Sequence, residues 1–81
     1  MIFGNITPDK KFISASKRMK IERVKFEHIN RRIRDEVVGD YSIIGTRLLG
    51  SDYVTEVVVT SENKDFDVEG VIDKIVEYSR A

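Results

Sequence analysis

Two segments of this 81-residue chain place apolar residues at helical spacing, and each apolar face needs a surface to pack against. One segment covers residues 17–38 and the other covers residues 66–79. An antiparallel β-sheet is the natural partner for two such helices. The apolar positions are Met19, Phe26, Ile29, Ile33 and Val37 in the first segment, and Val68, Val71, Ile72, Ile75, Val76 and Tyr78 in the second.

Each helical segment follows a pair of strand-like segments. Residues 2–6 and 11–15 flank a turn that contains Pro8, which presets the backbone of a β-turn. Residues 41–49 and 53–60 flank a second turn, and the latter segment contains three consecutive β-branched valines. The sequence therefore predicts one α+β domain over residues 1–81, a two-layer sandwich of ββα-ββα order. We expect a roughly four-stranded antiparallel sheet with both helices on one face.

Local signals suggest where the helices begin and end. Gly39 suits the position just after the first helix, where a positive φ is common, and Asp65 suits the N-cap of the second. Ile21 and Val24 fall off the apolar stripe of the first helix. A start nearer Arg23 therefore remains an alternative to a start at Lys17.

The residues that most enzymes and metal sites require are scarce. The chain has no cysteine and a single histidine, His28, which argues against disulfides, thiolate chemistry and zinc. No phosphate-binding or calcium-binding loop motif is present. We therefore expect no enzyme, no catalytic residue, no metal site and no cofactor. No apolar run reaches the length of a membrane span, so we expect a cytoplasmic protein without a membrane partner.

The zero formal net charge hides a strong asymmetry along the chain. Residues 1–34 contain ten Lys and Arg against three Asp and Glu, whereas residues 35–81 contain four against eleven. An asymmetry of this kind indicates contact with nucleic acid or another acidic partner. It also fits attraction between the two halves, within one chain or between subunits.

The first functional hypothesis is a small non-enzymatic nucleic-acid-binding or nucleic-acid-associated regulatory protein. Its basic helix would bind the phosphates of DNA or RNA. Phe12, Tyr41 and Tyr53 would stack on bases if the open face of the sheet presents them. The predicted nucleic-acid-binding residues are Lys10, Lys11, Lys17, Lys20, Arg23, Lys25, Arg31, Arg32 and Arg34.

The alternative hypothesis is a protein–protein interaction or adaptor module that self-associates, as a homodimer, and has no nucleic-acid contact. Its basic and acidic regions would pair across an interface, or an exposed edge of the sheet would dock a partner strand. The two hypotheses differ in one physical point. The first requires the cations of the first helix to remain available to an anionic molecule, and the second does not.

Overall fold

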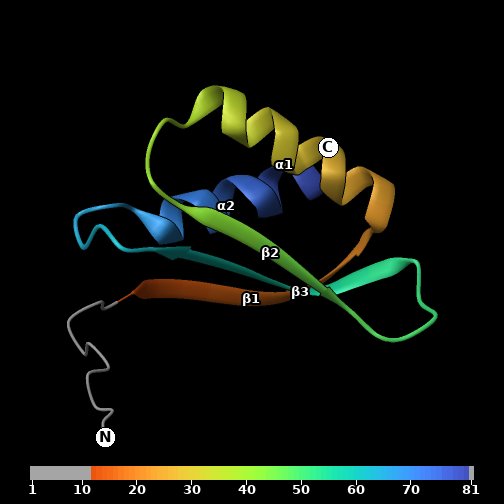
Figure 1. Ribbon diagram of the computed structural model, residues 1–81. Coiled ribbons are helices and arrows are strands. Elements are labelled where there is room, and N and C mark those ends of the chain that lie inside the picture. The colour runs from red at the N-terminus through yellow and green to blue at the C-terminus, as the bar shows by residue number, and fades with distance from the viewer. Residues whose placement is uncertain (1–11, 81) are drawn as a thin grey trace, which may run out of the picture.

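The computed structural model describes residues 12–80 and shows an α+β chain of βαββα order. A three-stranded sheet carries two helices (Figure 1). The strand expected at residues 2–6, together with Lys10 and Lys11, lies outside the described residues. The elements are β1 (Ile13–Glu22), α1 (Arg23–Glu36), β2 (Ser42–Arg47), β3 (Tyr53–Ser61) and α2 (Val68–Ser79).

β3 lies in the middle of the sheet and pairs antiparallel with both β1 and β2. The two outer strands are therefore parallel to each other, and α1 connects them by crossing over one face. The hairpin of β2 and β3 confirms the two strands expected there, with slightly different ends. The turn between them contains Gly50, whose φ of 80° is the one positive value among the described residues.

The first helix is shorter than the predicted range 17–38, and its first residue confirms the alternative start nearer Arg23. Residues 17–22 belong to β1, and α1 begins at Arg23 and ends at Glu36. In β1 the residues at positions 13, 15, 19 and 21 are partly or fully buried, as alternate residues of a strand with one covered face should be. The ββα order expected for the first half is therefore replaced by βα in the described chain.

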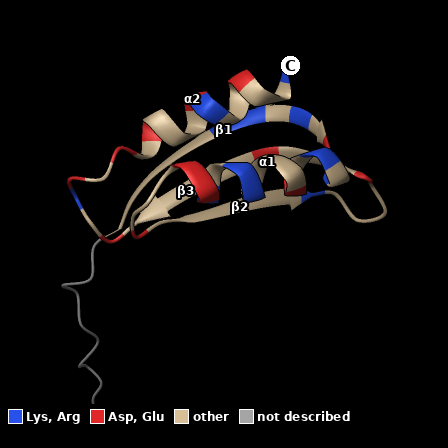
Figure 2. Cartoon of the chain, turned by 90° about the horizontal axis from the view of Figure 1, so that it is seen from above, with Lys and Arg blue, Asp and Glu red and all other residues tan. Residues whose placement is uncertain are grey.

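Both helices lie on the same face of the sheet, with α2 on the β1 side and α1 on the β2 side (Figure 2). This arrangement confirms the two-layer packing with the helices on one face. Between the layers lies a single apolar cluster. Its buried members are Ile21, Phe26, Ile29, Ile33, Tyr41, Ile43, Val54, Val57, Val59, Val68, Val71, Ile72 and Ile75.

Tyr41 closes the C-terminal end of α1. Its hydroxyl donates to the carbonyl oxygen of Val37 at 2.9 Å and lies 3.4 Å from that of Ile33. The Tyr41 hydroxyl thus provides a hydrogen-bond donor to carbonyl groups at the C-terminal end of α1. The positive φ expected at Gly39 is wrong. Gly39 is required for a different reason, because an added Cβ would lie 2.6 Å from the ring of Phe66.

The second helix is capped two residues later than predicted. Asp67 is the N-cap of α2, and its carboxylate accepts a hydrogen bond from the backbone N–H of Gly70 at 2.9 Å. Asp65 precedes the helix and makes no such contact. Within the described part of the chain, neither helix combines the length and the apolar character needed to cross a membrane.

Candidate interaction surfaces

The structure divides the predicted nucleic-acid-binding residues between two elements. Lys17 and Lys20 lie on β1, with Arg18 between them, and not on a helix. The other predicted cations among the described residues lie on α1. These are Arg23, Lys25, Arg31, Arg32 and Arg34. Because the cations are divided between a strand at one edge of the sheet and a helix above the sheet, the single broad cationic helix expected from the sequence does not exist (Figure 2).

Two of the α1 arginines are paired with carboxylates of their own helix. Arg23 Nη1 lies 3.3 Å from Glu27 Oε2, and Arg32 Nε lies 3.2 Å from Glu36 Oε2. Both pairs have the spacing of four residues that brings side chains together on a helix. The guanidinium of Arg32 also lies 4.0 Å from the centroid of the Tyr78 ring on α2. Arg32 is therefore part of the contact between the two helices.

Two more α1 cations are bound by neutral groups of the chain. Lys25 Nζ donates to the carbonyl oxygen of Ser79 at 2.9 Å, at the C-terminal end of α2. Arg34 Nε donates to Asn30 Oδ1 at 3.3 Å and lies 5.6 Å from the Tyr41 ring. Only Arg31 is an exposed α1 cation for which the described residues provide no partner. Four of the five α1 cations are thus already engaged.

Glu36 is the centre of the α1–α2 contact. Its Oε1 accepts a hydrogen bond from the Tyr78 hydroxyl and lies 3.9 Å from Lys74 Nζ. The hydrogen bond from Tyr78, and then that from Arg32, lower the pKa of the Glu36 carboxyl below its ordinary value. The same hydrogen bond raises the pKa of the Tyr78 hydroxyl, and the bond to Glu36 raises the pKa of Arg32. Every member of this cluster has a partner, so it stabilises the fold rather than offering a ligand site.

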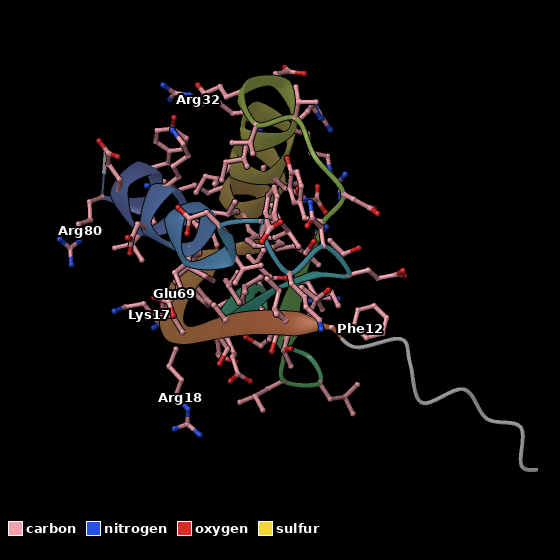
Figure 3. All side chains as sticks on the ribbon, turned by 90° about the vertical axis from the view of Figure 1, so that its left-hand side faces the viewer. Phe12, Lys17, Arg18, Arg32, Glu69 and Arg80 are labelled. Carbon is pink, nitrogen blue, oxygen red and sulfur yellow. The ribbon has the colours of Figure 1, made fainter. Side chains whose placement is uncertain are left out.

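The β1 cations face in different directions. Arg18 pairs in register with Glu56 and extends away from the helices (Figure 3). Lys20 lies on the same open face, with its Nζ 4.5 Å from the centroid of Tyr53. Lys17 pairs in register with the buried Val57, so it lies on the helix-covered face, at the side of the sheet close to Glu69 of α2 (Figure 3).

The three aromatic residues considered for base stacking have different environments. Tyr41 is buried and stacks on Phe66, with the ring centroids 4.9 Å apart, so it cannot present a face to a base. Tyr53 and Phe12 are exposed. Tyr53 lies on the open face, since its neighbour Val54 is directed into the core.

Sequence reasoning missed the exposed apolar residues of the β2–β3 hairpin. Ile44 on β2 is 52 % exposed, and Leu48 and Leu49 in the turn are 69 % and 105 % exposed. Two adjacent leucines directly before the turn glycine were the available signal, because a turn of a small domain is rarely buried. Exposed apolar side chains that gather on one element are typical of a docking surface.

The described residues contain no group of three or more His, Asp or Glu side chains placed to hold a metal ion. Comparison with protein-family models, with curated proteins and with solved structures found no match for this chain. The function of the chain is therefore inferred from its own surfaces.

Proposed function

We propose that this chain is a protein-interaction module that self-associates. The observation that carries the proposal is the hairpin of β2 and β3, where Ile44, Leu48 and Leu49 are exposed beside an outer strand whose second edge pairs with no strand among residues 12–80. An exposed strand edge offers backbone donors and acceptors to another strand, and adjacent apolar side chains add burial. The engagement of most α1 cations within the chain removes the main support for a basic helix that binds phosphates.

Sedimentation velocity over a range of protein concentrations tests this proposal. We expect a concentration-dependent dimer at both low and high salt, because strand pairing and apolar burial depend little on ionic strength. A monomer at every concentration and at both salt concentrations would contradict the proposal. A dimer present only at low salt would replace it with pairing of opposite charges.

Polynucleotide binding remains a second candidate, now on the open face of the sheet rather than on the helix. The specific observation is that Arg18, Lys20 and Tyr53 share this face, with the Lys20 ammonium over the Tyr53 ring. Cations next to an exposed aromatic ring suit single-stranded nucleic acid. The same face also carries Glu56, a carboxylate that opposes phosphate binding.

A cytoplasmic location also remains a prediction.

Fluorescence anisotropy with labelled single-stranded and duplex oligonucleotides across a salt series tests the second candidate. Arg18→Ala should weaken binding and lower the slope of log K against log salt by about one unit per lost phosphate contact. Arg31→Ala is the matched control, since Arg31 is an exposed cation on α1. An effect of Arg31→Ala alone would restore the helix as the binding element, and absence of binding at low salt would exclude both surfaces.

A further inference from the structure

The two outer strands of the sheet differ in how well their edges are protected against pairing. β1 carries Lys17 on the helix-covered face and an irregularity in register between Arg18 and Ile21, where it has one residue more than β3. A lysine directed toward the covered face and a bulge are both devices that prevent another strand from adding to an edge. The β1 edge is therefore protected.

β2 has none of these devices over residues 42–46. Its register with β3 is regular over this stretch, and it contains no charged residue and no proline before Arg47. The extra residue near the end of the β2–β3 pair belongs to β3, so β2 itself remains straight. Ile44, at the middle of the strand, presents an apolar side chain on the open face. The β2 edge is therefore open to strand addition.

The side of α1 next to this edge carries both signs of charge. Lys25, Arg32 and Glu36 face α2, as their contacts with Ser79, Tyr78 and Lys74 show. The opposite side carries Glu27 toward the start of the helix and Arg31 and Arg34 toward its end, lining one shallow hollow with Asn30. Glu27 also borders a second hollow with Gly45 and Arg47 of β2. Arg23, the ion-pair partner of Glu27, lies on the same side of α1. An antiparallel copy of the helix would bring Glu27 toward Arg31, the exposed α1 cation for which the described residues provide no partner.

We propose that a second copy of this chain pairs its β2 antiparallel with β2, centred on Ile44. This proposal rests on the proposed function and specifies the surface through which the chain self-associates. The two Ile44 side chains meet at the twofold axis, and Ser42 of each copy faces Thr46 of the other. The sheet extends to six strands. The two α1 helices run antiparallel along the axis, which brings Glu27 of each copy toward the half of the other helix that carries Arg31 and Arg34.

Single-cysteine variants test this pairing, since the natural chain has no cysteine that would compete. Ile44→Cys places a thiol at the proposed axis, and directly opposed residues of an antiparallel pair lie close enough for a disulfide. Ser16→Cys is the matched control, because Ser16 and Ile44 both pair with Val58 and so lie in one row of the open face. Under mild oxidation we expect a covalent dimer of Ile44→Cys on a non-reducing gel and none of Ser16→Cys.

Charge substitution at the same two positions provides a second readout. Ile44→Lys places two like charges opposite each other and removes apolar burial, so the dissociation constant should rise by at least about tenfold. Ser16→Lys should leave it unchanged. Circular dichroism checks that both variants are folded, as expected for side chains on an open face.

The outcomes separate this inference from the proposed function. If the wild-type chain sediments as a dimer, but Ile44→Cys does not cross-link and Ile44→Lys still dimerises, the β2 edge is the wrong surface and self-association stands. If the wild-type chain remains a monomer, self-association itself is wrong. Equal cross-linking of Ser16→Cys and Ile44→Cys would show contact between open faces rather than between edges, and would also overturn the β2 pairing.

Discussion

Asp67 sets the beginning of α2. Its carboxylate satisfies the backbone N–H of Gly70, one of the four donors that the first turn of a helix leaves unpaired. Asp65, two residues earlier, has a similar side chain, but the helix gains nothing from it. Replacing each aspartate by alanine therefore gives two matched variants, one with and one without the loss of the N-cap.

Asp67→Ala should lower the free energy of unfolding by about 0.5–2 kcal/mol, the usual cost of removing an N-cap. Asp65→Ala should change it by no more than about 0.5 kcal/mol, as is typical for an exposed residue without a special role. Urea denaturation of both variants provides the measurement. Equal effects of the two substitutions would show that the helix is not capped at Asp67.

Glu36 gives the α1–α2 contact a dependence on pH. Its pKa is lower in the folded chain than in the unfolded chain, so the folded state prefers the charged carboxylate. This contribution to stability is present above the ordinary carboxyl pKa and is lost as the pH falls through the lowered value. Because the side chain is exposed, the contribution is small.

Glu36→Gln should therefore lower the melting temperature slightly at neutral pH, and the difference from the wild-type chain should shrink as the medium becomes acidic. Thermal unfolding followed by circular dichroism across that range measures the difference. Glu62→Gln is the control, since Glu62 is an exposed carboxylate outside both helices. A difference between wild type and Glu36→Gln that does not change with pH would contradict the role of the charge.

At the scale of elements, the contact of Phe26 with Gly45 positions α1 over β2. A Cβ at position 45 would lie 2.7 Å from Cε2 of the Phe26 ring, closer than side-chain atoms approach each other. Phe26 is buried, and a Cγ of Val54 would also lie 3.1 Å from the added Cβ. The absence of a side chain at position 45 is thus a condition for the packing of the two layers.

Gly45→Ala should lower the free energy of unfolding by about 1–3 kcal/mol, the typical cost of overpacking a core. Ser42→Ala is a control on the same strand, with its side chain exposed, and should be nearly neutral. Chemical denaturation of both variants gives the comparison. A neutral Gly45→Ala would mean that α1 shifts freely over the sheet.

The class of fold, the two helices on one face and the β2–β3 hairpin were predictable from periodicity and turn residues. The boundary between β1 and α1 was predicted only as one of two alternatives, because residues 17–22 are compatible with either period. Met19 fits the helical stripe of Phe26 and Ile29 and also the alternation of a strand. Ile21, which does not fit the helical stripe, was the signal for a strand. The pairing of β1 with β3 decides the matter, and a contact between residues so far apart in the chain leaves no local pattern.

The candidate surfaces were less predictable than the fold, because they depend on which charges find partners. The sequence places basic residues in the first half and acidic residues in the second, but folding brings them together. Arg32 of the basic half and Glu36 of the acidic half pair across one turn of α1. Part of the basic half is therefore engaged within the fold, at the contacts of Arg32 with Glu36 and of Lys25 with the carbonyl oxygen of Ser79. The exposure of Ile44 depends in turn on β2 being an outer strand.

For the whole molecule, one protected edge and one open edge would limit the proposed association to two copies. A dimer joined through β2 leaves only β1 at each end of the extended sheet, and β1 is protected. In the proposed dimer, assembly is closed because only one edge of each copy accepts a strand. We therefore expect the protected β1 edge to limit the number of copies in the assembly.

Lys17→Ile removes the charge on the covered face of β1 and leaves the bulge between Arg18 and Ile21 in place. The regular stretch of β1 before the bulge, residues 13–17, should then pair with another β1 edge. The two interfaces would then alternate, and dimers should grow into long assemblies that raise the light scattering with time. Ser16→Ile adds the same apolar side chain to the open face and leaves Lys17 in place, so it controls for hydrophobicity alone. The double variant Lys17→Ile with Ile44→Lys has only the β1 edge available and should stop at dimers. If Ser16→Ile scatters as strongly as Lys17→Ile, general hydrophobic aggregation explains the growth, and the lysine does not protect the edge.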